Sequence, residues 1–182
     1  MSRILAERKG VGGDTLGYRH DGVPVPPVPE ATTYIDVGAL TIGIEYRFLT
    51  DEIVEAAREK EPRLAEGHPD APLQDEGVSL HVCDNDRTEY IRFDNFGGDP
   101  HYHYIVPGAY NVMVPYDEAA NGPFIDWALE RLQASMPDML REAGAGELAD
   151  RVDGAGMGST MAEVAQRVKE AMHRPVDSSR VE

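Results

Sequence analysis

The stretch that decides the fold runs from Val78 to Tyr116 and reads VSLHVCDNDRTEYIRFDNFGGDPHYHYIVPGAYNVMVPY. Through most of it apolar and polar residues alternate, which is the period of strands that bury one face. Turn-forming runs interrupt the alternation at residues 84–87, 95–100 and 107–108. The pattern predicts four antiparallel strands that form two hairpins.

The first predicted hairpin is closed by a tight turn at residues 85–86. That turn sets Leu80 opposite Ile91 on an apolar face, and it sets His81 opposite Tyr90 on the other face. The local pattern and the strand pairing then agree with each other, which favours this hairpin over other arrangements of the same residues.

The second predicted hairpin turns at residues 107–108, a Pro-Gly pair typical of type II turns. A two-residue connection there places His101 and His103 on one face with Val112 and Val114, and it places the neighbouring tyrosines on the other face. Neither face is a simple solvent face. We therefore expect helices or a second subunit to cover both sides.

A longer strand precedes the two hairpins. From Leu40 to Phe48 apolar residues alternate with other residues, and the alternation changes parity at Gly38, which predicts a bulge or bend. Beyond Asn121 the chain has the start signals and apolar stripes of helices. We predict an α+β fold: an antiparallel sheet of four or five strands, made of a long bent strand and two hairpins and packed by C-terminal helices.

The domain organisation follows from the same patterns. Residues 33–174 are expected to form a single α+β domain, because the regular periodicity lies there. Residues 1–32 are rich in glycine and proline, which predicts a flexible N-terminal arm or a strap on a neighbouring subunit. Residues 175–182 are expected to fray.

Composition restricts the class of function. The chain has 182 residues, with 33 acidic residues against 17 basic ones and a formal charge of -16. Such a charge repels nucleic acid and anionic membranes, so we expect neither as a partner, and a homo-oligomer or a small molecule instead. Cys83 is the only cysteine, which favours a reducing cytoplasm. No apolar run reaches the roughly 18 residues of a membrane span.

His101 and His103 form the main candidate site. They lie two positions apart on a predicted strand, so both side chains project from the same face, with Cα atoms about 6.5 Å apart. At that separation two imidazoles can share one metal ion. Asp99, Asp94 and His81 are candidate further ligands.

Two imidazoles and a carboxylate suit Zn, Fe(II) or Mn and leave coordination positions open for water or substrate. A bound metal would lower the pKa of water or polarise a substrate oxygen. This interpretation predicts a small metal-binding protein or a metal-dependent enzyme, whose reaction is either hydrolytic or oxidative. The structural alternative is that both imidazoles form hydrogen bonds within the fold, because strands produce His-x-His pairs by chance.

The Gly97-Gly98 pair followed by His101 and His103 resembles the first motif of the cupin family. In that family a glutamate follows the histidines, whereas residues 106–114 contain no acid here, and no second histidine motif appears downstream. The resemblance covers only this short segment and does not indicate membership of the family.

The tyrosines of the same region support a second interpretation, in a different class of function. In this interpretation we expect a ligand pocket on one face of the sheet, lined by Tyr90, Arg92, Tyr102, Tyr104 and Tyr110 together with a histidine. The chain would then be a non-catalytic, self-associating module that binds a small ligand or a protein. Tyrosines also fit half-buried strand surfaces as packing residues, so pocket and packing roles are alternatives.

Overall fold

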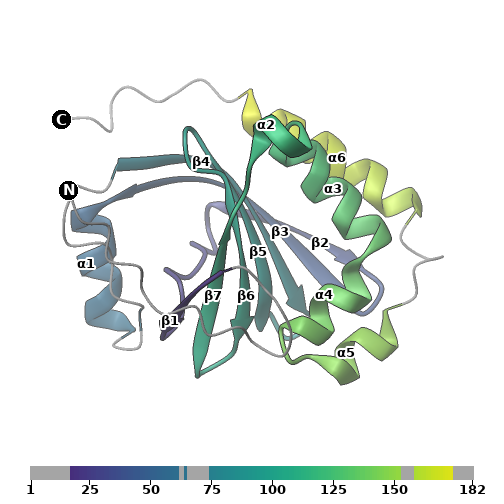
Figure 1. Ribbon diagram of the computed structural model, residues 1–182, viewed down its shortest axis with the longest axis horizontal. Helices are drawn as coiled ribbons and strands as arrows, with labels where there is room; N and C mark the ends of the chain where they lie inside the picture. Colours follow the sequence, from purple (N-terminus) through teal and green to yellow (C-terminus); the bar gives the residue numbers. More distant parts are fainter. Residues whose placement is uncertain (1–16, 62–63, 65–73, 153–157, 174–182) are drawn as a thin grey trace.

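Seven strands and six helices make up the part of the chain that the structure describes. The structure is a computed structural model, and it describes residues 17–61, 64, 74–152 and 158–173 (Figure 1). The strands are β1 (Tyr18–Asp21), β2 (Thr32–Val37), β3 (Leu40–Thr50), β4 (Gln74–Asp84), β5 (Glu89–Phe96), β6 (His101–Val106) and β7 (Tyr110–Pro115). The helices are α1 (Asp51–Lys60), α2 (Glu118–Asn121), α3 (Phe124–Ala134), α4 (Met136–Glu142), α5 (Gly146–Arg151) and α6 (Gly158–Met172).

All seven strands form one antiparallel sheet, in the order β1-β7-β6-β5-β4-β3-β2. The predicted α+β class and the antiparallel sheet are confirmed, but the expected number of four or five strands is wrong. One extra strand arises at Gly38, whose φ of 64° closes a tight turn between Val37 and Leu40 and divides the predicted bent strand into β2 and β3. The other is β1, which pairs with β7.

The ends of the chain bear on the predicted domain boundaries. Residues 1–16 of the predicted arm and the predicted tail 175–182 lie outside the described residues. Residues 17–32 are described, and they contain β1 and the connection from β1 to β2. The single domain at 33–174 stays a prediction.

The β4–β5 hairpin differs from the predicted register by two residues. Its loop has three residues instead of two, because Arg87 takes a φ of 69° and the Asp84 amide donates to the Thr88 carbonyl (3.0 Å). A β-bulge between Val82 and Cys83 adds the second shift. An even shift keeps each side chain on its predicted face. The observed pairs are Leu80 with Phe93, His81 with Arg92, and Ser79 with Asp94.

The β6–β7 hairpin differs from the predicted register by one residue, and this exchanges the faces of β7. The turn at residues 107–108 forms, with an Ala109 amide that donates to the Val106 carbonyl (3.0 Å), but Val106 pairs with Tyr110 one residue later. An odd shift reverses which side chains share a face. The histidines of β6 therefore share their face with Asn111 and Met113, and the predicted neighbours Val112 and Val114 are wrong.

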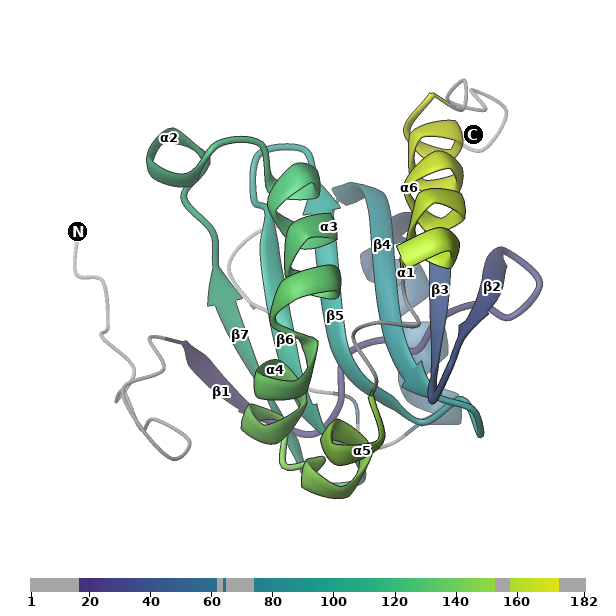
Figure 2. The same ribbon diagram turned by 90° about the vertical axis from the view of Figure 1, so that its right-hand side faces the viewer.

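Helices α3 to α6 cover one face of the sheet, as Figure 2 shows. Each buries apolar residues; α3, for example, buries Phe124, Ala128 and Leu132 at helical spacing. These residues pack against apolar side chains of the central strands, and the predicted packing by C-terminal helices is confirmed. No helix within the described ranges is long and apolar enough to cross a membrane.

The other face of the sheet, here called the polar face, is crossed by residues 22–31, here called the crossing segment. β1 and β2 lie at opposite edges of the sheet, so the chain between them must span its width. Buried Arg92 and Arg47 both donate to the Val25 carbonyl, at 2.9 and 3.0 Å. Proline-rich backbone offers carbonyl acceptors but few N–H donors. Arginines projecting from the sheet are therefore suited to bind it.

Gly77 in β4 provides a test of the fold next to the polar face. Its φ is 156°, and a Cβ atom there would lie 2.1 Å from the Asn95 carbonyl oxygen. We expect Gly77→Ala to lower the free energy of unfolding by about 2–4 kcal/mol, measured by urea denaturation. Gly97→Ala is the control, because a Cβ there meets nothing within 4 Å. Equal losses in the two variants would contradict the backbone path described for β4.

Candidate metal centre

Asp94 on β5 and the two histidines of β6 meet on the polar face. Asp94 pairs directly with His101 across the two strands. Because residues two apart on a strand project to the same side, His103 joins them. Each of the three residues offers one ligand atom, and these atoms lie within 4.8 Å of one another. The structure thus brings together three of the five predicted ligands.

These three side chains are almost closed off from solvent. The exposed fractions are 2% for Asp94 and 7% for each histidine. Both Nε2 atoms face the same carboxylate oxygen, Asp94 Oδ2, at 3.5 Å from His101 and 3.3 Å from His103. The other carboxylate oxygen, Oδ1, accepts a hydrogen bond from the Ser79 hydroxyl. The carboxylate is therefore held in one orientation.

The far nitrogens of both rings are bound to acceptors. His101 Nδ1 lies 2.7 Å from the Asp99 carbonyl oxygen, and His103 Nδ1 lies 2.9 Å from Asn111 Oδ1. The amide of Asn111 is oriented by its NH₂ group, which donates to the Gly22 carbonyl (3.1 Å), so its oxygen must face the ring. Each Nδ1 therefore carries the hydrogen. In the neutral ring, each Nε2 then presents a lone pair.

Three electron-pair donors consequently converge on one point. Two neutral Nε2 atoms and a carboxylate oxygen repel one another unless a positive charge lies between them. Ligand atoms about 2.1 Å from a tetrahedral ion lie about 3.4 Å apart. The observed nitrogen–oxygen separations of 3.3 and 3.5 Å agree with that spacing. The buried cluster of Asp94, His101 and His103 could therefore hold a divalent metal ion.

Local electrostatics keep two of the three ligands, Asp94 and His103, in the forms that a metal requires. Burial raises the pKa of Asp94, but the two neighbouring histidines and the charge of Arg92 outweigh it, and the pKa lies well below its ordinary value. Burial lowers the pKa of both histidines. For His101 the adjacent carboxylate outweighs burial and the pKa is raised, whereas the pKa of His103 stays lowered. Asp94 is thus ionised and His103 neutral at neutral pH, as metal ligands must be.

The other two predicted ligands do not reach the cluster. Asp99 contributes its backbone carbonyl, while the residue is exposed. His81 faces Glu89 Oε1 through Nδ1 (2.6 Å) and Glu45 Oε2 through Nε2 (3.2 Å). Both ring nitrogens of His81 are therefore engaged by carboxylates outside the cluster, and neither is directed at Asp94.

His81 belongs to a layer of buried charges beside the cluster. Arg92 forms a two-point ion pair with Glu89, with nitrogen–oxygen distances of 2.8 and 2.6 Å. His81 bridges the same Glu89 to Glu45 on β3. The layer continues into the candidate metal centre because β5 carries both Arg92 and Asp94 on its polar face.

The five residues predicted to line a ligand pocket lie in different places. Tyr102 and Tyr104 pack against the helix-side core, with ring centroids 5.6 Å apart. Tyr90 also packs against that core. The Tyr110 ring lies beneath an arginine side chain of β1, at 3.8 Å. Arg92 points to the opposite, polar face. The structure therefore does not bring these residues together around one pocket.

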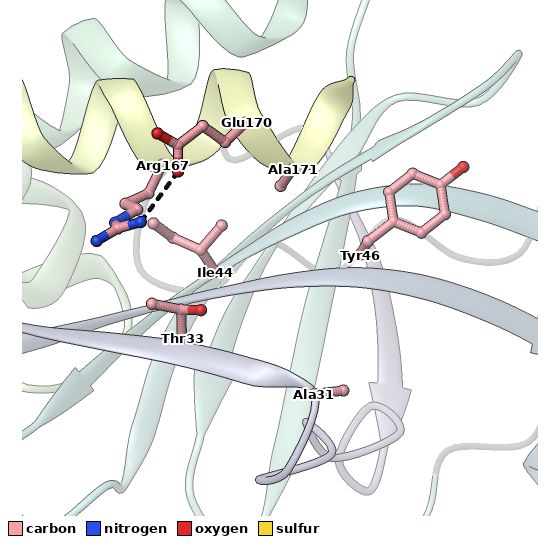
Figure 3. A pocket seen from close by; sticks show the side chains of 7 residues that line it. All are labelled: Ala31, Thr33, Ile44, Tyr46, Arg167, Glu170 and Ala171. Atoms are coloured by element: carbon pink, nitrogen blue, oxygen red, sulfur yellow. Dashed lines mark hydrogen bonds and ion pairs between the residues drawn. The ribbon is translucent and has the colours of Figure 1, made fainter. Parts of the chain in front are cut away.

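A small hollow lies on the helix side, away from the metal cluster (Figure 3). It is lined by Ala31, Thr33, Ile44, Tyr46, Arg167, Glu170 and Ala171. Arg167 and Glu170 form an ion pair with each other (3.0 Å), and the Tyr46 hydroxyl donates to Glu76 (2.5 Å). Since these polar groups are already paired, the hollow offers little to orient a ligand.

Sequence reasoning missed the residues that orient the ligands. Asn111 stands inside a strand pattern, where asparagine is uncommon, and this was the available signal. Ser79 shares its face with His81 by strand alternation, but the predicted register sets it opposite Arg92, whereas the observed register sets it opposite Asp94. Both roles depend on strand register, which local patterns do not fix.

Comparison with known proteins gives a family but no relative of known activity. Residues 34–168 match the family described as "Domain of unknown function (DUF7700)". No match was found among curated proteins or among solved structures. The matched range includes Asp94, His101 and His103, and it also includes Ser79 and Asn111.

Acid sensitivity tests the charge of Asp94. A carboxylate whose folded pKa is depressed adds stability above its unfolded pKa of about 3.9, and that stability is lost as the pH falls through the folded pKa. In metal-free protein, we expect the wild type to lose more unfolding free energy than Asp94→Asn between about pH 6 and about pH 3. Urea denaturation at each pH measures the difference. Parallel losses in the two proteins would show that Asp94 has no such role.

Proposed function

The chain belongs to the DUF7700 family, and we propose that it binds one divalent metal ion through Asp94 Oδ2 and the Nε2 atoms of His101 and His103. Three protein ligands leave a coordination position for an oxygen ligand. Structural zinc sites use four protein ligands, whereas catalytic sites use three and keep one position open. We therefore assign the chain to the metal-dependent enzymes.

The single observation that supports this function is the hydrogen bonding of the two Nδ1 atoms. A histidine that only bound Asp94 would donate from Nε2, which here requires a second proton because Nδ1 already carries one. Metal-binding histidines instead donate their far N–H to a carbonyl, carboxylate or water, which directs the near nitrogen at the ion. Both rings follow the metal-binding arrangement.

The spacing of the ligand atoms favours Zn(II) as the metal. Ligand atoms of an octahedral ion with bonds of about 2.1 Å lie about 3.0 Å apart, whereas those of a tetrahedral ion lie about 3.4 Å apart. The nitrogen–oxygen separations of 3.3 and 3.5 Å agree better with the tetrahedral case. Fe(II) and Mn(II) are the other candidates, because two histidines and a carboxylate suit them as well.

Metal analysis tests the proposed function. Protein purified without a tag should contain one Zn(II), Fe(II) or Mn(II) per chain by mass spectrometry. We expect His101→Ala, His103→Ala and Asp94→Ala each to weaken binding more than about a hundredfold, because each removes a ligand. His173→Ala is the control, since this exposed histidine directly follows α6 and its ring bonds to the Lys169 carbonyl in the last turn of that helix. Metal that persists in all three ligand variants would refute the site.

Asn111 tests whether ring orientation matters. We expect Asn111→Ala to weaken Zn(II) binding about 10–100-fold, because His103 loses the acceptor that fixes its hydrogen on Nδ1. Competition with a chromophoric chelator measures the affinity, and circular dichroism checks folding. Asn121→Ala serves as the control, because that amide bonds to the Asp117 carbonyl in an exposed helix. Unchanged affinity in Asn111→Ala would mean that this amide does not position the ligand.

A further inference from the structure

Arg47 on β3 is a buried cation with an unused hydrogen-bond donor. It is only 3% exposed. Its Nη2 donates to the Val25 and Pro26 carbonyls (3.0 and 3.1 Å), and its Nε lies 3.5 Å from Glu45 Oε2. Its Nη1 has no hydrogen-bond partner within the described part of the chain. A buried donor left without an acceptor is costly, so this nitrogen favours a ligand that accepts.

Arg47 lies beside the candidate metal centre on the polar face. Residues that pair across neighbouring strands form a row, and the row of Arg47 continues with Gly77 on β4 and Phe96 on β5. Gly77 places no side chain in this row, and the Phe96 ring contacts His101 (centroids 5.8 Å apart). The adjacent row consists of Glu45, Ser79, Asp94 and His101. Arg47 and Asp94 thus lie on neighbouring rows of the polar face, on β3 and β5, with β4 between them.

Two carboxylates of the polar face already face cationic side chains before any metal is added. Glu89 forms an ion pair with Arg92 (2.6 Å), and Glu45 lies 3.5 Å from Arg47. Asp94 is then the carboxylate that remains for the metal, so a divalent ion bound by two neutral histidines would leave one positive charge in excess. Asp75 and Asp99 reach solvent, where their charges are screened. Because uncompensated buried charge is costly, the metal-loaded site favours an added anion.

We propose that the metal-loaded protein binds a small oxyanion, with one oxygen at the open coordination position and another accepting a hydrogen bond from Arg47 Nη1. This inference rests on the proposed metal site and names the substrate class of that site. Arginine suits the role because it stays charged and forms strong hydrogen bonds to carboxylate and phosphate oxygens. A carboxylate and a phosphate share this chemistry, so experiment must distinguish them.

Protein loaded with Co(II) provides the test, because the visible absorption of bound Co(II) changes with its ligands. Acetate and inorganic phosphate are titrated separately in a buffer without coordinating anions. We expect a saturable spectral change with at least one anion, and no binding of that anion to the metal-free protein by calorimetry. The anion that binds more tightly identifies the substrate as a carboxylate or a phosphate.

Arg47→Lys keeps the positive charge but removes Nη1. We expect it to weaken anion binding about tenfold or more, while Co(II) affinity without the anion stays at the wild-type level. Arg131→Lys is the matched control. Arg131 Nε is also buried without a partner in the described residues, but Arg131 lies on α3, on the helix side of the sheet. This variant should bind the anion like the wild type.

Each outcome decides a separate point. If neither anion changes the Co(II) spectrum, or if Arg47→Lys binds the anion as tightly as the wild type, the oxyanion site is wrong while the metal site stands. If the wild type binds no Co(II), the proposed metal site itself is wrong. If Arg47→Lys does not fold, nitrogen NMR of wild-type arginine side chains decides instead: the Arg47 Nη1 signal must shift when the anion binds, and an unshifted signal overturns the proposal.

Discussion

Two hydrogen bonds from the Nδ1 atoms of His101 and His103 determine whether the candidate metal centre can bind an ion. The Asp99 carbonyl and the Asn111 amide oxygen each accept the Nδ1 hydrogen of one histidine. Strand geometry already points both rings to the same side, and these two bonds then leave both lone pairs facing Asp94. The arrangement also ties the centre to the crossing segment, because Asn111 is bound to the Gly22 carbonyl.

The two faces of the sheet differ because different partners cover them. Helices bury the apolar face with side chains, whereas the crossing segment covers the polar face mainly with backbone. Its carbonyl oxygens accept from Arg47 and Arg92, and those arginines in turn balance buried carboxylates. A buried polar layer of this kind is stable only when its donors, acceptors and charges are matched. The candidate metal centre lies where that matching is incomplete.

Strand alternation allowed part of the site to be predicted from sequence. The common direction of His101 and His103 depends only on the two-residue period of a strand, not on register. Which side chains face them depends on register, and one extra residue in the turn after Pro107 exchanged the faces of β7. For the same reason Asp94, Asp99 and His81 were equal candidates in sequence, although only Asp94 lies directly across from His101.

Contacts between distant residues explain what the sequence did not reveal of the fold. The parity change at Gly38 fits a bend as well as a tight turn, and only the pairing of Val37 with Leu40 decides between them. The proline-rich backbone of the crossing segment has carbonyl acceptors but few N–H donors with which to pair. Its attachment depends on Arg47 and Arg92, which are remote in sequence. No local pattern predicts such contacts.

The central claim is that a metal ion lies between Asp94, His101 and His103. Anomalous diffraction at the zinc absorption edge, from crystals of untagged Zn(II)-loaded protein, tests it most directly. We expect one strong peak about 2.0–2.2 Å from Asp94 Oδ2 and from both Nε2 atoms. A strongest peak elsewhere, or rings turned so that Nδ1 faces the carboxylate, would contradict the claim.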